Sequence, residues 1–297
     1  MRVFVTGATG FVGSAVTVEL IAAGHQVLGL TRSEAGAQAL EAAGAEVHRG
    51  SLEDLDSLKA GAAAADGVIH LAFNHDFSTY MANCEDDRRA IGALASALVG
   101  TARPLLVTSG TGMGLGEPGR PATEDDAPAP SSAIPRAASE EAAEAAAAQG
   151  VNASVVRLPQ VHDTRRQGLV TYAIAVAREK GVSAYVGDGA NRWTAAHVSD
   201  VARLYRLALE RGERGARWHA IAEEGIPMRA IAETLGRRLG LPVVSIPADQ
   251  AGTHFGWLGM FATSDVPASG ALTRQRLGWT PTGPGLIADL EQLVLDA

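Results

Sequence analysis

Short apolar runs alternate with amphipathic stretches through the first half of the chain. The apolar runs have the length of buried strands, and apolar residues recur at helical spacing in the stretches between them. The predicted strands are Val3–Thr6, Gln26–Thr31, Glu46–His48, Gly67–Leu71, Leu105–Ser109 and Ser154–Arg157. The predicted helices are Phe11–Ala23, Ala35–Ala43, Leu52–Ala60, Asp86–Val99 and Pro135–Gln149. This alternation indicates an α/β fold of the Rossmann type, a doubly wound parallel sheet with helices on both faces.

The second half of the chain has a mixed, mostly helical pattern. Helices are predicted at Leu169–Lys180, Val198–Arg211, Pro227–Gly240, Ala248–Phe261, Ala268–Leu277 and Leu286–Leu295. Short strands are predicted at Ala184–Val186, Ala216–Ile221 and Val243–Ile246. We therefore expect residues 1–165 to form the sheet domain and residues 191–222 to return to it. Residues 166–190 and 223–297 are expected to form a smaller C-terminal substrate-binding lobe.

The carboxyl-terminal edge of the predicted sheet is where candidate chemistry should gather. Right-handed crossovers place the ends of all parallel strands at one edge, and ligands of open α/β sheets bind there. The segment from Gly110 to Ser132 follows the fifth strand and is rich in Gly, Pro, Ser and acidic residues. A loop of this length inside a compact domain usually has a function.

Three glycines at three-residue spacing connect the first predicted strand to the first helix, in the segment Thr6-Gly7-Ala8-Thr9-Gly10-Phe11-Val12-Gly13. Gly7 permits the tight turn, Gly10 lets the backbone approach a pyrophosphate, and Gly13 lets helix and strand pack closely. The helix N-terminus offers unpaired N–H groups and a partial positive charge to phosphates. A glycine triplet alone is a weak signal, but at the first strand–helix junction it predicts a dinucleotide site.

The end of the second strand indicates which dinucleotide is preferred. An NAD site usually has Asp or Glu there to accept from the ribose 2′-hydroxyl, whereas an NADP site uses Arg. This chain has Arg32 and Ser33, with no acid before Glu34. A guanidinium offers a planar donor fork to a 2′-phosphate. We therefore predict NADP, with NADPH preferred over NADH; the alternative is a solvated arginine at a helix start.

Several segments resemble the extended short-chain dehydrogenase/reductase superfamily, which includes the nucleotide-sugar epimerases. They are the glycine motif, Gly50-Ser51-Leu52, His70-Leu71-Ala72, Val107-Thr108-Ser109, Arg157-Leu158-Pro159-Gln160-Val161, Gly187-Asp188-Gly189 with Arg192, His197-Val198-Ser199-Asp200-Val201-Ala202 and Leu277-Gly278-Trp279-Thr280-Pro281. Together they extend over nearly the whole chain. The resemblance implies cofactor contacts at Thr6, Gly7, Thr9, Gly10, Phe11, Val12, Gly13, Arg32, Ser33, Ser51, Leu52, Leu71, Ala72, Phe73, Thr108, Leu158 and Pro159.

The chain departs from this superfamily at the catalytic pair. The resemblance implies a Tyr-x-x-x-Lys motif, in which the lysine lowers the tyrosine pKa and holds the ribose while the tyrosine shuttles the proton. Arg136 stands where the tyrosine is expected, and Glu140 where the lysine is expected. No tyrosine of the chain is followed by a lysine four residues later. The chain therefore resembles an atypical member of the superfamily.

Four residues near the sheet edge are candidates for catalysis without that tyrosine. Ser109 and Thr111 are placed to bond a substrate carbonyl, with a loop cap as the alternative for Ser109. Arg136 can act as a fixed cationic donor, although a pKa above about 12 makes arginine a poor proton source. The alternative is a surface arginine paired with Glu140. His162 is a candidate proton donor, or it bonds the loop backbone.

Candidate substrate residues come from two segments. Asn74 and His75 follow the fourth strand, where they either face a substrate or belong to a plain loop. The resemblance implies that an arginine matching Arg192 contacts a nucleotide-sugar diphosphate, and Trp193 beside it would add an aromatic wall for a small-molecule substrate. His197 is a further substrate candidate, with a core histidine as the alternative.

Composition narrows the classes of function. A net charge of −8 disfavours nucleic-acid and anionic-membrane partners. The sequence has neither a signal-peptide pattern nor an apolar run long enough to span a membrane, so a cytoplasmic location is expected. The single cysteine, Cys84, excludes internal disulfides and is expected to be an inert hydrophobe, and no metal-ligand spacing occurs. Trp257 and Trp279 are expected to be packing residues.

Three functions fit these observations. The favoured one is an NADP(H)-dependent oxidoreductase that reduces a small carbonyl, imine or activated alkene without the usual Tyr/Lys pair. The alternatives are an epimerase or dehydratase, which the missing base disfavours, and a non-catalytic NADP-binding redox sensor. The small residues of the predicted helices Asp86–Val99 and Pro135–Gln149 also allow a homodimer.

Overall fold

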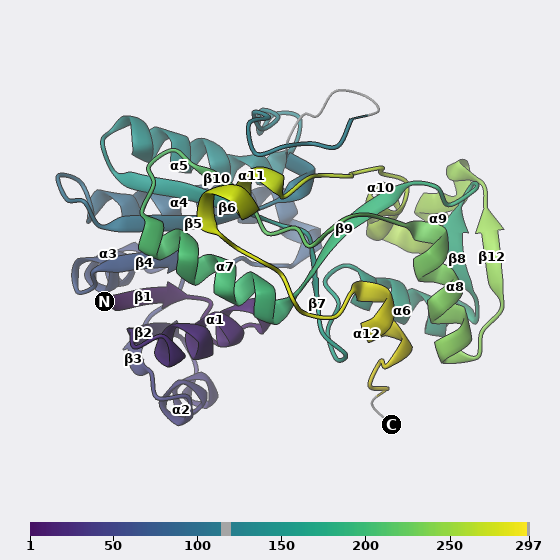
Figure 1. Cartoon of the computed structure of the whole chain (residues 1–297), viewed down its shortest axis with the longest axis horizontal. Helices are drawn as coiled ribbons and strands as arrows, with labels where there is room; N and C mark the ends of the chain where they lie inside the picture. The colour runs from purple at the N-terminus through teal and green to yellow at the C-terminus, as the bar shows by residue number, and fades with distance from the viewer. Residues whose placement is uncertain (114–119, 296–297) are drawn as a thin grey trace.

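The computed structural model describes residues 1–113 and 120–295, and its centre is a seven-stranded parallel sheet (Figure 1). Its strands are β1 Arg2–Thr6, β2 Gln26–Thr31, β3 Glu46–Arg49, β4 Gly67–His70, β5 Pro104–Gly110, β6 Asn152–Leu158 and β10 Arg217–His219. Their order across the sheet is β10-β6-β5-β4-β1-β2-β3. The strand order therefore reverses between β1 and β4, the place where open α/β sheets bind ligands. This topology confirms the predicted doubly wound Rossmann-type fold.

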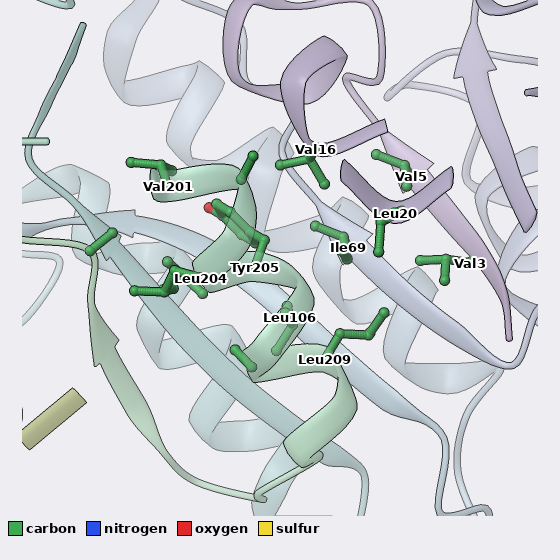
Figure 2. Packing of buried hydrophobic residues seen from close by; sticks show 14 of the residues in the cluster. Val3, Val5, Val16, Leu20, Ile69, Leu106, Val201, Leu204, Tyr205 and Leu209 are labelled. Carbon is green, nitrogen blue, oxygen red and sulfur yellow. The ribbon is translucent and has the colours of Figure 1, made fainter. Parts of the chain in front are cut away.

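Helices cover both faces of this sheet. On one face lie α1 Phe11–Ala22, α2 Glu34–Ala42 and α7 Val198–Arg211, and on the other lie α3 Leu55–Ala63, α4 Tyr80–Ser96 and α5 Ala138–Ala148. Figure 2 shows how Leu204 and Leu209 of α7 lie over Ile69 and Leu106 of the sheet, in the same cluster as Leu20 of α1. Each fully buried side chain of this size contributes about 1.5–3 kcal/mol to folding.

A second, mostly helical lobe lies beyond the carboxyl ends of the sheet strands (Figure 1). It contains a three-stranded sheet of β7 Gln160–His162, β9 Arg192–His197 and β11 Glu223–Pro227, and a pair of strands, β8 Ser183–Val186 and β12 Val243–Ile246. Its longer helices are α6 Val170–Lys180, α8 Met228–Leu239 and α12 Leu286–Glu291. No helix in the described part of the chain is long and apolar enough to cross a membrane.

Three of the helices expected from the sequence begin differently in the structure. The helix expected at 52–60 begins at Leu55, since the Asp54 side chain accepts a hydrogen bond from the Ser57 amide. The helix expected at 86–99 is α4, which begins at Tyr80 and ends at Ser96. A short 3-10 turn, η1 Phe77–Thr79, comes directly before it. The helix expected at 135–149 begins as a 3-10 turn, η3 Pro135–Ala137, and continues as α5.

The C-terminal lobe differs more from the sequence-based expectation. The single helix expected at 248–261 is four short pieces, η4 Ala248–Gln250, α9 Ala251–Phe255, η5 Gly256–Leu258 and α10 Gly259–Ala262. Gly256 interrupts it with a φ of 59°, which no regular helix contains. The strands β7, β9 and β11 were not expected, and α11 Ala271–Leu277 begins three residues later than expected. The expected loop at 110–132 contains the 3-10 turn η2 Thr111–Met113, while its residues 114–119 lie outside the described residues.

Candidate functional site

The glycine turn between β1 and α1 has the geometry of a phosphate-binding cradle. Gly7 has a φ of 68°, and a Cβ atom there would lie 2.7 Å from the backbone nitrogen of Ala72. A Cβ atom on Gly13 would lie 1.9 Å from the carbonyl oxygen of Gly7. Glycine is therefore required at both positions, for the turn itself and for close packing of α1 on the strand before it.

The N-terminus of α1 adds hydrogen-bond donors to this turn. Gly10 is the N-cap residue of this helix of 12 residues, and no side chain caps it in the described structure. The first-turn N–H groups of Phe11, Val12 and Gly13 therefore have no partner within the helix. Unpaired N–H groups and the helix dipole attract phosphate oxygens, and Thr9 is exposed beside them. These residues fit the diphosphate of a nicotinamide dinucleotide.

Thr6 lies beneath this cradle. Its buried hydroxyl accepts hydrogen bonds from the backbone N–H groups of Leu71 and Ala72, both at 3.2 Å. The same oxygen lies 2.8 Å from Nδ1 of His70, so its own hydrogen is donated to that nitrogen. Thr6 thus joins the ends of β1 and β4 below the glycine turn, and its hydroxyl has no remaining hydrogen for a ligand.

Two arginines flank the end of β2. Arg32 is exposed, and Ser33 caps α2 by accepting a hydrogen bond from the Gly36 amide at 3.0 Å. Arg49, at the end of β3, lies opposite Thr31 in the sheet register and donates to the carbonyl oxygen of Ser33 at 2.9 Å. Arg49 was not among the residues predicted from the sequence, although its position at the end of the strand that pairs with β2 was a usable signal. Nη2 of Arg49 also forms an ion pair with the Glu34 carboxylate at 2.5 Å, so two guanidinium groups and one carboxylate lie at this end of the sheet edge.

The turn after β3 contains Ser51 and Leu52, two of the residues for which the resemblance implies a cofactor contact. A hydrogen bond from the Ser51 side chain and the charge of Arg32 both lower the pKa of Glu53. Leu52 is partly buried and packs against the apolar cluster on the α3 side of the sheet. Ser51 and Arg32 therefore share Glu53 as an acidic neighbour at this end of the sheet edge.

Arg136 lies at the carboxyl edge of the sheet, fixed by three hydrogen bonds. Its Nη1 donates to Oδ2 of Asp87 at 3.0 Å and to the Ser139 hydroxyl, and its Nη2 donates to the carbonyl oxygen of Thr108 at 3.0 Å. The guanidinium carbon lies 4.2 Å from the centre of the Phe73 ring. The ion pair between Arg136 and Glu140, the alternative from the sequence, does not form. Arg136 pairs with Asp87 of α4 instead.

Asp87 connects Arg136 to the sheet. Its Oδ1 lies 2.9 Å from Nε2 of His70, whose Nδ1 accepts from Thr6, so the histidine donates to Asp87. The Ser139 hydroxyl donates to Oδ2 at 2.5 Å. Burial alone would raise the pKa of Asp87, but Arg136, His70 and Ser139 outweigh it and hold this pKa below its ordinary value. We call Thr6, His70, Asp87, Ser139 and Arg136 the arginine network.

Glu140, where the lysine of the usual pair is expected, forms a buried ion pair with Arg157 of β6. Both side chains are fully buried, and the guanidinium donates through Nε and Nη2 to the two carboxylate oxygens at 2.9 and 2.8 Å. The Ser109 hydroxyl donates to Oε1 of Glu140 at 2.7 Å, and Nε2 of His219 lies 3.3 Å from Nη1 of Arg157. The Ser109 hydroxyl is therefore already committed to this buried ion pair.

The other candidates around β5 and β6 make mainly internal contacts. The Thr108 hydroxyl donates to the carbonyl oxygen of His70 at 2.7 Å and lies 2.7 Å from the Tyr205 hydroxyl of α7. The Thr111 hydroxyl lies 3.1 Å from that of Thr194, and Thr111 is buried. Leu158 and Pro159, at the end of β6, are partly buried.

His162 lies in the second lobe rather than at the surface of the sheet edge. It is fully buried in β7, and its Nδ1 lies 2.7 Å from Oδ2 of Asp289 on α12. Burial lowers the pKa of His162, although Asp289 acts in the opposite direction. His197 caps α7 by accepting from the Ser199 amide, and its ring lies 5.8 Å from that of His162. The structure thus brings these two histidines together beside Asp289.

Arg192 and Trp193 point to different surroundings. Arg192 is half-buried and donates through Nε and Nη2 to the two carboxylate oxygens of Asp265, at 3.1 and 2.9 Å. That hydrogen bond raises the pKa of Arg192 further. Trp193 is buried in the apolar core of the second lobe, and its Nε1 donates to the carbonyl oxygen of Phe261. The two residues therefore do not form one wall.

The segment after β4 lies beside Arg136. Nδ1 of His75 lies 3.1 Å from the carbonyl oxygen of Phe73, so this nitrogen carries the ring hydrogen. Loss of hydration and the charge of Arg136 lower the pKa of His75. Asn74 makes mutual hydrogen bonds with Asn83 of α4, and its Oδ1 accepts from the Asp76 amide. Of the substrate candidates, His75 is the one that the structure brings near Arg136.

The fold and the glycine cradle define a nicotinamide-dinucleotide-binding protein of the short-chain dehydrogenase/reductase type. A model described as the NAD dependent epimerase/dehydratase family matches residues 3–221, and the chain belongs to this family. It is 49% identical to an uncharacterised protein of Schizosaccharomyces pombe, with 98% of each chain aligned. It is 30% identical to a UDP-glucose 4-epimerase of Streptomyces lividans over 95% of this chain and 92% of that one.

Solved structures agree on the fold. A dTDP-glucose 4,6-dehydratase of Streptomyces venezuelae, crystallised with NAD bound, superimposes with a TM-score of 0.78. The match extends over 99% of this chain and 95% of that chain at 19% sequence identity. At this identity the match concerns the fold alone. The family that the sequence model identifies depends on nicotinamide dinucleotides.

Proposed function

We propose that this chain is an NADP(H)-dependent oxidoreductase that reduces a small carbonyl, imine or activated alkene, with Arg136 in place of the usual Tyr/Lys pair. The observation that carries the proposal is the position of the Arg136 guanidinium, which the arginine network fixes at the sheet edge beside Phe73. A fixed cation beside the reacting centre stabilises negative charge that develops on an acceptor oxygen or nitrogen.

The chain's own residues suit each part of the cofactor. The glycine turn and the α1 N-terminus would hold the diphosphate, and Arg32 and Arg49 would hold a 2′-phosphate. When bound, the reduced nicotinamide would supply two electrons and one hydrogen to the acceptor. Arg136 uses three of its five N–H groups in the arginine network, which leaves two for the acceptor atom.

A reductase fits this site better than an epimerase or a dehydratase. Those reactions need a base that removes a proton from a substrate carbon or hydroxyl. Arg136 keeps its protons at any working pH, and Glu140 is fully buried against Arg157. Neither residue of the altered pair can therefore act as that base. Reduction instead needs a group that stabilises the negative charge developing on the acceptor atom, and the Arg136 guanidinium can do this.

Calorimetry with NADPH and NADH tests the cofactor assignment. We expect NADPH to bind more tightly than NADH, and the variants Arg32→Ser and Arg49→Ser each to weaken NADPH about 10- to 100-fold, since each loses a charged hydrogen bond. Binding of NADH should not change in either variant. Equal affinity for both coenzymes, or no binding of either, would contradict the assignment.

Turnover separates the oxidoreductase from a redox sensor. NADPH consumption is followed with one representative each of carbonyl, imine and activated-alkene acceptors. We expect turnover with at least one class, and its loss in Arg136→Met with NADPH affinity retained. Binding of NADPH without turnover of any acceptor would support the sensor and exclude the proposed reductase.

A further inference from the structure

An aromatic cluster joins the segment after β4 to the C-terminal lobe. The Phe77 ring of η1 stacks on the Trp257 ring of η5, with centroids 3.9 Å apart and an interplanar angle of 11°. Tyr172 of α6 meets Trp257 edge-on at 5.0 Å and Phe77 at 6.2 Å. We call Phe77, Tyr80, Tyr172 and Trp257 the aromatic bridge.

The aromatic bridge is not part of an apolar core. Trp257 and Tyr172 are each 39% exposed, whereas Trp193, Trp218 and Trp279 are buried. Trp279 is buried in the core, as expected, whereas Trp257 packs against the rings of Phe77 and Tyr172 and stays partly in solvent. Large aromatic rings held partly in solvent by stacking on one another offer a surface for a planar ligand.

The aromatic bridge leads to Arg136. Tyr80 stacks on Phe77 at 5.5 Å and meets Phe73 at 6.3 Å, and the Arg136 guanidinium lies over Phe73 at 4.2 Å. Ring contacts are therefore continuous from Trp257 to the fixed cation. This juxtaposition suits a molecule with a planar conjugated part for the rings and a carbonyl oxygen for the guanidinium.

In the described structure, the polar groups around Arg136 do not include one that can readily donate a proton to a reduced substrate. The hydroxyls of Ser109 and Ser139 donate to Glu140 and Asp87, and neutral His75 has its hydrogen on Nδ1, which bonds Phe73. The Tyr80 phenol bonds Cys84, and burial raises the pKa of Tyr80 to about 12. A reaction here should therefore give a delocalised, weakly basic anion that Arg136 can hold, rather than a localised alkoxide that needs immediate protonation.

We propose that the substrate of this site is a planar conjugated carbonyl compound, an enone or a quinone, held against the aromatic bridge with its oxygen on Arg136. This proposal rests on the proposed function, which supplies the reductant, a reduced nicotinamide dinucleotide. Two electrons and one hydrogen pass to the β-carbon of an enone, where a C–H bond forms as the nicotinamide C–H bond breaks. The π pair moves to the carbonyl oxygen, and the resulting enolate takes its proton from water.

Binding to the cofactor-free protein tests the aromatic bridge without turnover. The probe is menadione, a planar quinone, with affinity measured by calorimetry. We expect Trp257→Leu to weaken binding about five- to tenfold, since a ring–ring contact is lost, and Trp257→Phe to bind as the wild type does. Arg136→Met should weaken it as well. Unchanged affinity in Trp257→Leu would overturn the proposal, and equal melting temperatures of the two Trp257 variants verify that both fold.

Turnover with matched acceptors separates this inference from the proposed function. With NADPH, cyclohexenone and menadione should be reduced at least tenfold faster than cyclohexanone, and the Arg136→Met variant controls for uncatalysed reaction. Equal rates with cyclohexanone would overturn the conjugated-carbonyl proposal and leave the proposed function standing. Absence of turnover with these acceptors and with the imine of the first turnover experiment would overturn both.

Discussion

Arg136 and Glu140 stand one helical turn apart, at the two positions where the resemblance implies tyrosine and lysine, and the fold treats them in opposite ways. The Arg136 side chain is 13% exposed and its partner Asp87 is 1% exposed, so the arginine network runs from the sheet interior to the surface. Glu140 and Arg157 are both fully buried. The first position keeps a charged group that can meet a ligand, and the second has become part of the core.

This contrast shows that a position in a motif does not carry its role by itself. A lysine at the second position would touch the ribose of the cofactor, according to the resemblance. The carboxylate of Glu140 instead turns to Arg157 of the neighbouring strand and accepts hydrogen bonds from Nε and Nη2 of its guanidinium. The ion pair between α5 and β6 thus gives this position a structural contact in place of the ligand contact that the resemblance implies.

The largest effect should come from breaking the buried ion pair. Glu140→Ala leaves the Arg157 charge buried without a carboxylate, and we expect the free energy of unfolding to fall by about 3–5 kcal/mol. Denaturant unfolding followed by circular dichroism measures it. Glu144→Ala is the matched control one turn further, where an exposed pair with Arg217 is worth less than about 1 kcal/mol. An equal loss of unfolding free energy in the two variants would contradict a structural role of the buried ion pair.

The next largest effect concerns activity rather than stability. Arg136→Met removes the cation at the sheet edge, and we expect kcat/KM to fall about 100- to 1000-fold, the usual result of removing one such charge-stabilising donor. The drop in unfolding free energy should be smaller than that of Glu140→Ala. Arg89→Met, on the exposed side of α4, serves as a control for loss of an arginine. A large stability loss with unchanged turnover per folded molecule would mean that Arg136 is structural.

A smaller effect is expected from Asp87, a positioning residue for Arg136. Asp87→Asn keeps the shape but loses the charge that holds the guanidinium, and we expect kcat to fall about tenfold, a change of about 1.4 kcal/mol, with KM nearly unchanged. A purely structural role would lower the amount of folded enzyme and leave kcat per folded molecule alone. Steady-state kinetics corrected for the folded fraction separates the two.

The smallest effect is a pH dependence of stability from His219, which touches the buried ion pair. Burial, together with Arg157, lowers the pKa of His219, so the unfolded chain binds its proton more readily below about pH 6.5. Stability should therefore be level above that pH and decrease as the pH falls, by at most about 1.4 kcal/mol per unit for one group. Thermal unfolding between pH 8 and 5 measures the slope, which His219→Gln should reduce. An unchanged slope in the variant would refute the assignment.

Local sequence patterns predicted the framework of the fold and the dinucleotide cradle. The β1 strand, α1 and the glycines between them were predicted because turn geometry and helix-end chemistry depend on neighbouring residues. Boundaries failed where capping was overlooked, as at Asp54, and the lobe strand β9 was missed because it pairs with distant segments. The absence of Tyr-x-x-x-Lys is also a property of the sequence alone.

The tertiary structure decided which side chains at the site are available. Arg136 could have paired with Glu140 by helical spacing, but α4 brings Asp87 against it and β6 brings Arg157 against Glu140. The stacking of Phe77 on Trp257 likewise depends on two lobes meeting. Burial and long-range charge pairing arise only when distant segments pack together. They therefore decide which of the candidate side chains can contact a ligand, a question that the sequence alone leaves open.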